Sequence, residues 1–276
     1  GVRTIRITGT GSALPGRIVT NKELEQMVET SDEWIRERTG IGERHVSVGE
    51  TVVTLASEAA RKALEQAGKR AEEIDLILVA TCSPEQYLPC CACQVQAAVG
   101  AVNALAFDVN AACSGFLFAL NTADAYLRMG LAENALIIGS EVLSKLVDWT
   151  DRGSCILFGD GAGAVVVERC KAESRAVEEK QIPAAGILGR ALHSDGTGGG
   201  VLQCDARELT TPYARTSAVK TDQNQPMDDR EHFIQMDGQE VYRFATRRVP
   251  QCIEEALSDA GLTVPDIDLF VLHQAN

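Results

Sequence analysis

Residues 63–79 read ALEQAGKRAEEIDLILV, and residues 256–272 read ALSDAGLTVPDIDLFVL, with seven identities at a constant spacing of 193 residues. Each copy has the pattern of a helix end, a glycine suited to the C-cap, a short loop and a buried apolar strand. A helix-then-strand unit that occurs twice predicts two duplicated halves, each an α/β layer.

The segments before the two copies have helical periodicity. The first predicts a helix from near Thr51, with an apolar face of Leu55, Ala56, Ala59, Ala60, Ala63 and Leu64. The second predicts a helix from near Gly238, with an apolar face of Val241, Phe244, Ala245, Val249, Ile253 and Ala256. Both helices are therefore expected to cover a sheet with one face.

The remainder of the first half alternates strand and helix patterns. The apolar runs predict strands at 2–10, 74–81, 104–109 and 134–139, and a hairpin of 155–159 with 162–168 that turns at Asp160-Gly161. The periodic segments predict helices at 21–38, 51–68, 90–100 and 114–130. This alternation is typical of a largely parallel sheet covered by helices.

The duplication also predicts where the halves lie. We expect an N-terminal half at 1–175 and a C-terminal half at 176–276. The first half continues from residue 81 to about 175 beyond its repeated strand, whereas the second stops at Asn276, just past the matching strand 267–272. The repeat therefore predicts that the second half is incomplete in this chain.

Composition limits the classes of partner. The 276 residues are 45% hydrophobic and 24% charged, as in ordinary globular proteins. Twenty-six basic and 39 acidic residues give a net charge of −13 and an isoelectric point near 4.8, which argues against nucleic-acid and anionic-membrane partners. No apolar run is long enough to span a membrane.

Nine irregularly spaced cysteines favour free thiols in a reducing compartment over a disulfide framework. Cys90 and Cys93 form a C-x-x-C motif, but no second ligand pair and no histidine lie near them, so we expect no metal site. We interpret them as small core residues at the start of a helix.

The stretch from Phe107 to Phe116, FDVNAACSGF, predicts a strand end, a tight turn of small residues and a helix start. Cys113 then lies at a helix N-terminus, where unpaired N–H groups and the helix dipole favour a thiolate. Small neighbours leave room for a substrate carbonyl, as at other nucleophile elbows. The alternative is a buried structural cysteine.

A second candidate, His273, follows the apolar run 267–272 in the sequence His273-Gln274-Ala275-Asn276. The first copy of the repeat has Ala80 at the matching position, so the fold does not require an imidazole there. Functional groups of α/β folds lie at the carboxyl ends of strands, although a lone histidine is also compatible with a structural role.

Several motifs together resemble the β-ketoacyl-acyl-carrier-protein synthase III family. They are Thr30-Ser31-Asp32-Glu33-Trp34-Ile35, Arg38-Thr39-Gly40-Ile41, Asn110-Ala111-Ala112-Cys113-Ser114-Gly115-Phe116, Asp148-Trp149-Thr150-Asp151-Arg152, Gly159-Asp160-Gly161-Ala162-Gly163-Ala164 and His273-Gln274-Ala275-Asn276. The resemblance runs from Gly1 to Asn276. It implies the thiolase-like α/β fold, layered α-β-α-β-α, and condensation of an acyl-CoA, usually acetyl-CoA, with malonyl-acyl-carrier protein.

The resemblance also implies residue roles. Cys113 would be acylated, and His273 would donate a hydrogen bond to the enolate formed by decarboxylation. The residues implied for CoA and pantetheine are Trp34, Arg38, Arg152, Gly238, Ala275 and Asn276. The acyl pocket would be lined by Leu157 and Phe158, with Leu88 reaching the neighbouring subunit's pocket. Arg243, with Arg247 on the same helix face, would dock the acidic carrier protein; the alternative is a charge-balanced surface.

The family's catalytic asparagine, in a Gly-Asn-Thr-Ser context, and its oxyanion-hole glycine have no counterpart here. We therefore expect either a fragment of a longer enzyme, which the intact upstream motifs favour, or a non-catalytic partner subunit. Condensing activity of this chain alone is in doubt on the same ground. A thiolase-fold acyltransferase for another CoA ester and a cysteine hydrolase are further alternatives. The resemblance implies a homodimer, no cofactor beyond CoA thioester substrate, and a bacterial cytoplasm or plastid stroma.

Overall fold

A five-stranded mixed sheet forms the centre of the first half. The computed structural model describes residues 3–171, 174–177, 180–183, 185–206 and 232–274. The strand order is β1 (Arg3–Ala13), β7 (Asp160–Lys171), β6 (Asn134–Val142), β4 (Leu76–Ala80) and β5 (Leu105–Val109). β4 is parallel to both β5 and β6, whereas β7 is antiparallel to β6 and β1. The expectation of a largely parallel sheet thus holds only for three of the five strands.

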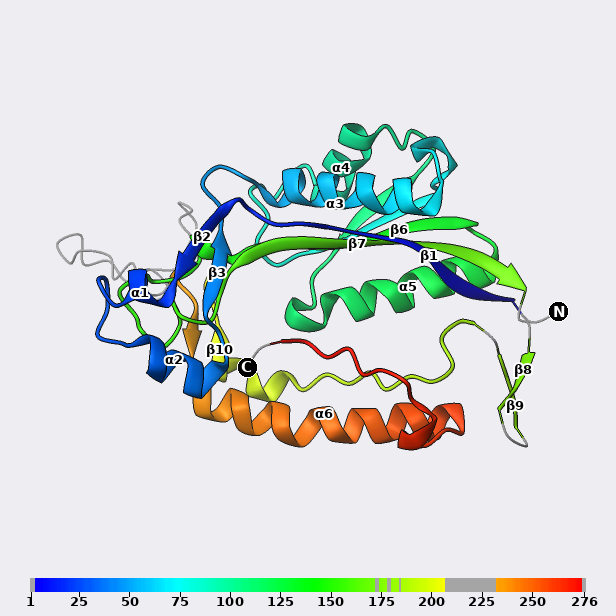
Figure 1. The fold of residues 1–276 in the computed structure, drawn as a ribbon. Coiled ribbons are helices and arrows are strands. Elements are labelled where there is room, and N and C mark those ends of the chain that lie inside the picture. The colour runs from blue at the N-terminus through cyan, green and yellow to red at the C-terminus, as the bar shows by residue number, and fades with distance from the viewer. Residues whose placement is uncertain (1–2, 172–173, 178–179, 184, 207–231, 275–276) are drawn as a thin grey trace, which may run out of the picture.

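Helices cover both faces of this sheet. α3 (Val52–Ala67) and α4 (Cys91–Val99) lie on one face and α5 (Gly115–Met129) on the other, as Figure 1 shows. Side chains of β4 alternate between two cores: Ile77 and Val79 pack under α3 and α4, while Leu76 and Leu78 pack on α5. All five residues of β4 are buried, so the apolar run has the composition of a strand covered on both faces.

α3 begins and ends where its capping residues predict. The hydroxyl of Thr51 accepts a hydrogen bond from the Thr54 N–H, and Gly68 closes the helix in the left-handed conformation at φ 63°. β1 approaches α3 closely because it carries glycines. A Cβ at Gly9 would lie 2.3 Å from the Ala63 carbonyl oxygen.

The expected helix at 21–38 is wrong, because the structure has two short helices there. They are α1 (Asn21–Leu24) and α2 (Asp32–Thr39), flanked by the hairpin of β2 (Arg17–Thr20) and β3 (Glu43–Val46). Ser31 has an extended conformation and its hydroxyl accepts the Trp34 N–H at 3.1 Å, so α2 starts afresh at this cap.

The expected hairpin of 155–159 with 162–168 is also wrong. Residues 152–157 form turns, and Cys155 and Ile156 are buried in a third cluster with Leu24 and Ile35. Asp160 makes no turn; it begins β7, and its carboxylate accepts the N–H groups of Ser47 at 2.7 Å and Ser144 at 2.9 Å. The hairpin partner of β7 is β6.

The second part of the chain is built around α6 (Gly238–Ala260). Before it lie β8 (Ser174–Val177), β9 (Lys180–Pro183), a 3-10 helix at Gly196–Val201, β10 (Leu202–Gln203) and β11 (Gln235–Met236). Arg190 joins α6 to the first half: its N–H donates to Asp259, its Nε donates to Asn121 of α5 at 2.6 Å, and it pairs with Asp124.

α6 repeats the geometry of α3. Gly261 caps it in the left-handed conformation at φ 67°, and 3-10 turns follow both caps, at Ala71–Glu73 and Val264–Asp266. A Cβ at Gly189 would lie 2.1 Å from the Ala256 carbonyl oxygen, just as Gly9 meets Ala63. These matching approaches support the duplication expected from sequence, while its division at residues 175 and 176 stays a prediction.

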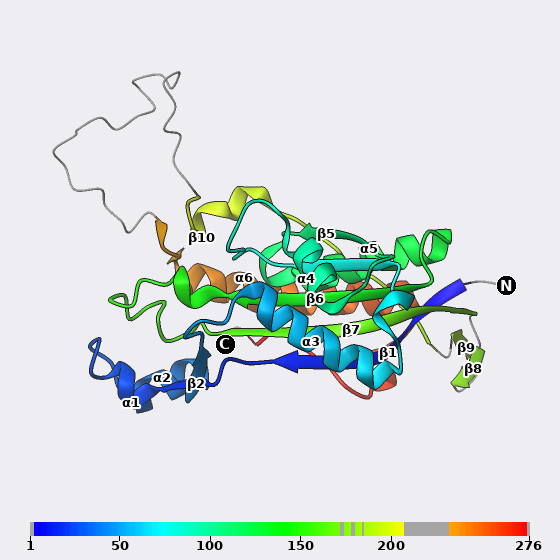
Figure 2. The same ribbon diagram turned by 90° about the horizontal axis from the view of Figure 1, so that it is seen from above.

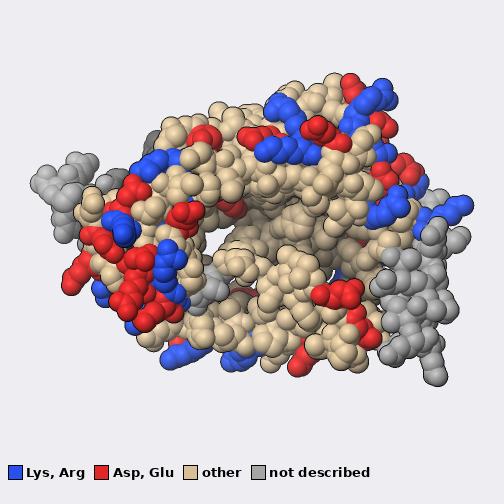
Figure 3. All heavy atoms as spheres, viewed as in Figure 1, with Lys and Arg blue, Asp and Glu red and all other residues tan. Residues whose placement is uncertain are grey.

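The expected strand at 267–272 is wrong in this structure. The segment is extended but has no ladder partner within the described part of the chain, and Leu269 and Val271 are 75% and 85% exposed. β4, its counterpart, has a strand on each side, and this explains the difference. Figure 2 shows α6 beneath the first-half sheet, and Figure 3 shows a hollow with mostly uncharged walls between that sheet and the α6 layer. No helix among the described residues is both long and apolar enough to cross a membrane.

Candidate active site

Cys113 lies on the tight turn between β5 and α5, as the sequence predicts. A 3-10 turn at Ala112–Ser114 links the strand to the helix, and Ala112 has a positive φ of 44°. An alanine there is conformationally strained, which is common at functional turns. Gly115 of the same segment packs tightly, because a Cβ there would lie 3.1 Å from the Ala80 Cβ. Cys113 itself is exposed.

The carboxyl ends of β4 and β6 add polar groups beside this turn. Glu141 of β6 accepts hydrogen bonds from the Cys82 N–H at 2.8 Å, the Thr81 hydroxyl at 3.1 Å and the Ser83 hydroxyl. The charge of Glu141 acts on the thiols of both Cys82 and Cys113. The carboxyl ends of three neighbouring strands thus contribute side chains to one end of the sheet.

The acid–base state of Cys113 differs from the sequence-based expectation. The pKa of its thiol is raised, first because surrounding protein atoms exclude solvent and also because Glu141 is negative; a backbone hydrogen bond opposes this but does not offset it. The expected shift toward thiolate at the helix start is therefore wrong for this structure. Exposure of one side of the residue still gives a substrate access to the sulfur. Burial and Glu141 raise the pKa of Cys82 to about 12.

Three of the six residues implied for CoA and pantetheine, Trp34, Arg38 and Arg152, lie together. The guanidinium carbons of Arg38 and Arg152 lie 4.8 Å and 5.2 Å from the centre of the Trp34 ring. Arg152 also donates to the Glu29 carbonyl oxygen at 3.0 Å. Trp34 packs against the third core cluster, so a fixed aromatic ring holds two guanidinium groups by cation–π contacts.

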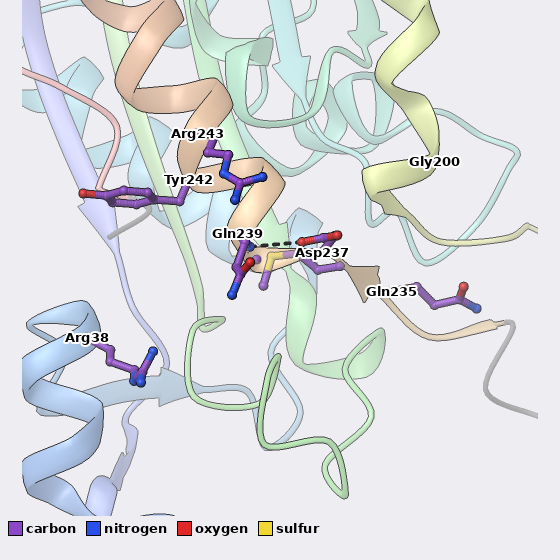
Figure 4. A pocket seen from close by; sticks show the side chains of 9 residues that line it. Arg38, Gly200, Gln235, Asp237, Gln239, Tyr242 and Arg243 are labelled. Carbon is purple, nitrogen blue, oxygen red and sulfur yellow. Dashed lines mark hydrogen bonds between the residues drawn. The ribbon is translucent and has the colours of Figure 1, made fainter.

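A cavity of about 1220 Å³ extends from this cluster to the start of α6. Figure 4 shows Arg38 of α2 on one side and Tyr242 and Arg243 of α6 on the other. Gly238 also lines it, as the sequence predicts. A neighbouring cavity of about 620 Å³ is lined by Arg38, Tyr242 and Gln274. Segments more than 200 residues apart in sequence therefore meet at Arg38.

Within the described residues, no hydrogen bond joins His273 to Cys113. His273 lies near the end of the exposed segment that follows α6. Its neighbour Gln274 reaches the smaller cavity. Ala275 and Asn276 lie outside the described residues.

The residues expected to line an acyl pocket lie apart. Leu157 and Phe158 are half-buried against the third core cluster, close to Trp34. Leu88 is 84% exposed in the loop before α4, as expected of a residue that reaches outward. Among the described residues, the apolar cluster that holds Leu157 and Phe158 does not include Leu88.

Arg243 and Arg247 are both exposed on α6. Arg243 forms an ion pair with Glu240 and lines the larger cavity. Arg247 lies one turn further along the same face. Glu240 thus balances the charge of Arg243, as in the alternative considered from the sequence.

Sequence reasoning missed Glu141, Tyr242 and Gln274. Glu141 could have been found, because a carboxylate near the end of the apolar strand GSEV needs several donors to be accommodated. Tyr242 and Gln274 give no such signal, since their meeting at Arg38 depends on how α6 packs. Within the described ranges, no group of three or more His, Cys, Asp or Glu side chains could hold a metal ion.

Comparisons with known proteins point to one family. The family model for 3-oxoacyl-[acyl-carrier-protein] synthase III matches residues 107–196, which include Cys113. The β-ketoacyl-[acyl-carrier-protein] synthase III of Clostridium acetobutylicum is 44% identical over 275 residues, covering 100% of this chain and 78% of that protein. The enzyme of the same name from Microcystis aeruginosa is 48% identical over 271 residues, covering 98% of this chain and 76% of that protein.

Solved structures agree with these sequence matches. The 3-oxoacyl-[acyl-carrier-protein] synthase III of Aquifex aeolicus superposes with a TM-score of 0.83 at 39% identity, covering 99% of this chain and 77% of that one. The Thermus thermophilus synthase III has the same TM-score at 38% identity, with 98% and 77% coverage. Their fold is that of this chain.

Proposed function

This chain belongs to the family of β-ketoacyl-[acyl-carrier-protein] synthase III, the condensing enzymes that start fatty-acid synthesis, and we propose that Cys113 is its residue that receives the acyl group from acyl-CoA. One observation carries the assignment: Cys113 is an exposed thiol on a strained turn between a strand end and a helix start. A thioester carbonyl can reach such a sulfur, and N–H groups at the helix start can stabilise the developing oxyanion.

The reaction has two half-reactions. The Cys113 thiolate attacks the carbonyl carbon of an acyl-CoA, most simply acetyl-CoA, and CoA leaves as its thiolate. The malonyl group on the carrier protein then loses carbon dioxide, and the resulting enolate attacks the acyl-Cys113 thioester. The new carbon–carbon bond releases the Cys113 thiolate. His273 would donate a hydrogen bond to the enolate oxygen, which needs a donor that stabilises it without quenching it.

CoA would bind between α2 and α6. Arg38 and Arg152, held on the face of Trp34, present guanidinium groups that fork onto phosphate oxygens. The cavity from Arg38 to Gly238 gives the pantetheine arm a path from the phosphates. Ala275 and Asn276 would complete that path. Trp34→Ala should raise the concentration of acetyl-CoA needed for half-saturation of acylation, with a smaller effect on the saturated rate.

The acyl pocket would be made by two copies of the chain. Leu157 and Phe158 would form its wall, and Leu88 of a second copy would close it. Their side chains supply only apolar surface, so the pocket would take an alkyl chain and reject a charged starter such as malonyl-CoA. Substituting Phe158 by Ala should increase acylation by butyryl-CoA relative to acetyl-CoA.

We propose a homodimer formed through the edge of the sheet. β5 is an edge strand of the sheet within the described part of the chain, and large apolar side chains are exposed around it: Tyr87, Leu88, Val102 and Leu105. An unpaired edge bordered by apolar side chains is suited to pairing with a second copy. Leu105→Lys should shift sedimentation toward monomer, whereas the control Leu202→Lys, on β10, should not. Equal behaviour of both variants would argue against this interface.

The carrier protein would dock on α6. Arg243 lines the cavity mouth, and Arg247 extends the basic surface by one turn. Opposite charge attracts an acidic carrier over about 8 Å at physiological salt despite the net charge of −13. In the complete protein, reversing both arginines to Glu should weaken use of malonyl-carrier protein at low salt and leave acylation of Cys113 by acetyl-CoA nearly unchanged. Arg248→Glu, on the same helix, is the control. Equal loss of both half-reactions would mean that α6 is only structural.

We place the protein in a bacterial cytoplasm or a plastid stroma. All nine cysteines are free in the structure, which suits a reducing compartment. The relatives named above are bacterial proteins. Fractionation of cells that express the chain, followed by detection with an antibody, tests this assignment.

Transfer of a radiolabelled acetyl group tests the central role of Cys113. Wild-type protein incubated with labelled acetyl-CoA should retain the label after denaturation, on a peptide that contains Cys113. Cys113→Ala should retain none. Cys82→Ser, the matched control at the same end of the sheet, should retain the label. Label on another cysteine, or none on folded wild-type protein, would contradict the proposal.

A further inference from the structure

Arg44 of β3 is a buried arginine to which the proposed function gives no role. It is 5% exposed and donates hydrogen bonds to the Val19 carbonyl oxygen at 3.0 Å, the Asn21 side-chain oxygen at 2.7 Å and the Ile156 carbonyl oxygen at 3.1 Å. The first two acceptors belong to β2 and α1, which lie beside β3 and α2 at one end of the molecule (Figure 1). The third is 112 residues away in sequence. One guanidinium therefore joins three segments of the chain.

The stability of the core does not account for an arginine at this position. All three acceptors are neutral, and among the described residues the Nε of Arg44 has no hydrogen-bond partner. A buried charge that only neutral groups contact costs free energy relative to an apolar side chain of similar size. What arginine adds is geometry, because its Nη2 donates to Asn21 and to Ile156 from one rigid, planar group.

The bond to Ile156 holds the turn that carries Arg152. A hydrogen bond from the Cys155 N–H to the Asp151 carbonyl oxygen at 3.0 Å closes this turn around Arg152. The carbonyl group of Ile156, which follows directly, accepts from Arg44. The backbone of Arg152 is thereby fixed relative to β3.

Asn21 carries a second link, from Arg44 to α2. It is 1% exposed, and its side-chain nitrogen donates to the Asp32 carboxylate at 2.8 Å and to the Ile41 carbonyl oxygen at 2.8 Å. Asp32 is the first residue of α2, and Ile41 lies just beyond its C-cap. One buried amide thus holds both ends of the helix that presents Trp34.

We propose that Arg44, together with Asn21, is a positioning residue for the nucleotide end of CoA, because it fixes Trp34 of α2 relative to Arg152 of the turn. This role presupposes the proposed function, in which those two side chains hold CoA. The guanidinium carbon of Arg152 lies 5.2 Å from the centre of the Trp34 ring in the absence of CoA. Since both supports are fixed beforehand, CoA binding requires less ordering of side chains. Arg44 is buried and acts on CoA only through these supports.

Acylation kinetics of the complete protein with two acetyl donors test this role. Acetyl-CoA carries the nucleotide, whereas S-acetyl-pantetheine delivers the same acetyl group to Cys113 without it. Arg44→Lys keeps the buried charge and loses the rigid fork. It should raise the concentration of acetyl-CoA needed for half-saturation by at least about fivefold, the cost of ordering the loosened side chains. The second-order rate constant with S-acetyl-pantetheine should change by less than about twofold, because that donor has no nucleotide to hold.

A second variant covers the case in which Arg44→Lys does not fold. Asn21→Asp keeps an acceptor for Arg44 and gives the buried guanidinium a carboxylate partner, but it cannot donate to Asp32. It should therefore fold and show the same selective loss with acetyl-CoA. Arg17→Lys is the matched control: Arg17 is an exposed arginine of β2 that pairs with Glu23, and its replacement should alter acylation by neither donor.

Two results would overturn the role of Arg44. An equal loss with both donors would mean that Arg44 only stabilises the fold, and unchanged half-saturation by acetyl-CoA would mean that it positions nothing. Trp34→Ala distinguishes these results from a failure of the proposed CoA site. If Trp34→Ala shows the selective loss and Arg44→Lys and Asn21→Asp do not, only the role of Arg44 is wrong. If Trp34→Ala shows no selective loss, the CoA site itself is wrong.

Discussion

Residues 51–80 and 244–273 are two copies of one sequence unit with different outcomes. Both contain a helix end closed by a left-handed glycine, Gly68 or Gly261, and a 3-10 turn at the same distance from it. The first copy continues into β4, which is buried between β5 and β6. The second continues into an exposed segment that pairs with no described strand.

The comparison separates local from non-local causes of structure. A cap and a 3-10 turn use hydrogen bonds within a few residues, so both copies form them. A central strand needs neighbours on both sides to satisfy its N–H and C=O groups, and needs helices to cover both faces. Identical sequence patterns therefore give a core strand only where those partners exist.

The largest expected difference between the copies is in the free energy of unfolding. Leu78 is fully buried in β4, and its repeat counterpart Val271 is exposed. Leu78→Ala should lower the free energy of unfolding by about 2–5 kcal/mol because it leaves a cavity. Val271→Ala should change it by less than about 0.5 kcal/mol. Denaturant titrations of both variants check this, and similar losses would mean that the second copy is packed in solution.

The glycines that let each extended segment approach its helix give a smaller difference. A Cβ on Gly9 meets the Ala63 carbonyl inside the sheet–helix core, and Gly9→Ala should cost about 1–3 kcal/mol of unfolding free energy. A Cβ on Gly189 meets Ala256 at an equally short distance, but α6 has no buried residue and can shift away. Gly189→Ala should cost under about 1 kcal/mol. Thermal unfolding followed by circular dichroism measures both; a larger loss for Gly189→Ala would reverse the interpretation.

The smallest expected effect concerns the residues at the carboxyl ends of the two copies. The first ends beside Glu141, which helps to raise the pKa of Cys113, and the second ends at His273. Since the thiolate is the nucleophile, acylation should quicken as pH rises. Glu141→Gln should move the pH–rate profile of acylation to lower pH and raise the rate at neutral pH severalfold. Burial is the larger cause of the raised pKa of Cys113, and this substitution does not remove it.

His273→Gln is the matched control for that experiment, because His273 is proposed to act only after acylation. It should leave the acylation profile unchanged and slow condensation with malonyl-carrier protein. If the pH–rate profile of acylation changed in His273→Gln and not in Glu141→Gln, the histidine would act in the first half-reaction.

Much of the first half follows from its sequence. The helix at 51–68 and the strand at 74–81 agree with α3 and β4 to within two residues, because caps and apolar periodicity act together there. The elbow at Cys113 was predicted from small residues between an apolar strand and a helix, and it is confirmed. Cap signals were also available where the prediction was wrong: Ser31 followed by two acidic residues indicates a second helix start.

The remaining differences depend on tertiary partners. The apolar run at 155–158 has a strand pattern, but residues 155–157 form turns. The side chains of the run pack in the core beneath α1 and α2. The raised pKa of Cys113 is caused first by burial and then by Glu141, which is 28 residues away in sequence and contributed by a different strand. The resemblance supplied Trp34, Arg38 and Arg152 as a group, and only the packing of α2 on the turn at 152–157 brings them together.

Hydrogen exchange of backbone amides tests the central contrast most directly. The account predicts that the amides of Leu76–Ala80 exchange only through global unfolding, because β5 and β6 hold them on both sides. The amides of residues 269–273 should exchange at nearly the rate of an unfolded chain. Both sets can be read from one peptide-resolved time course of the intact protein. Comparable protection of the two segments would contradict the account, because it would mean that the second copy also forms a paired strand.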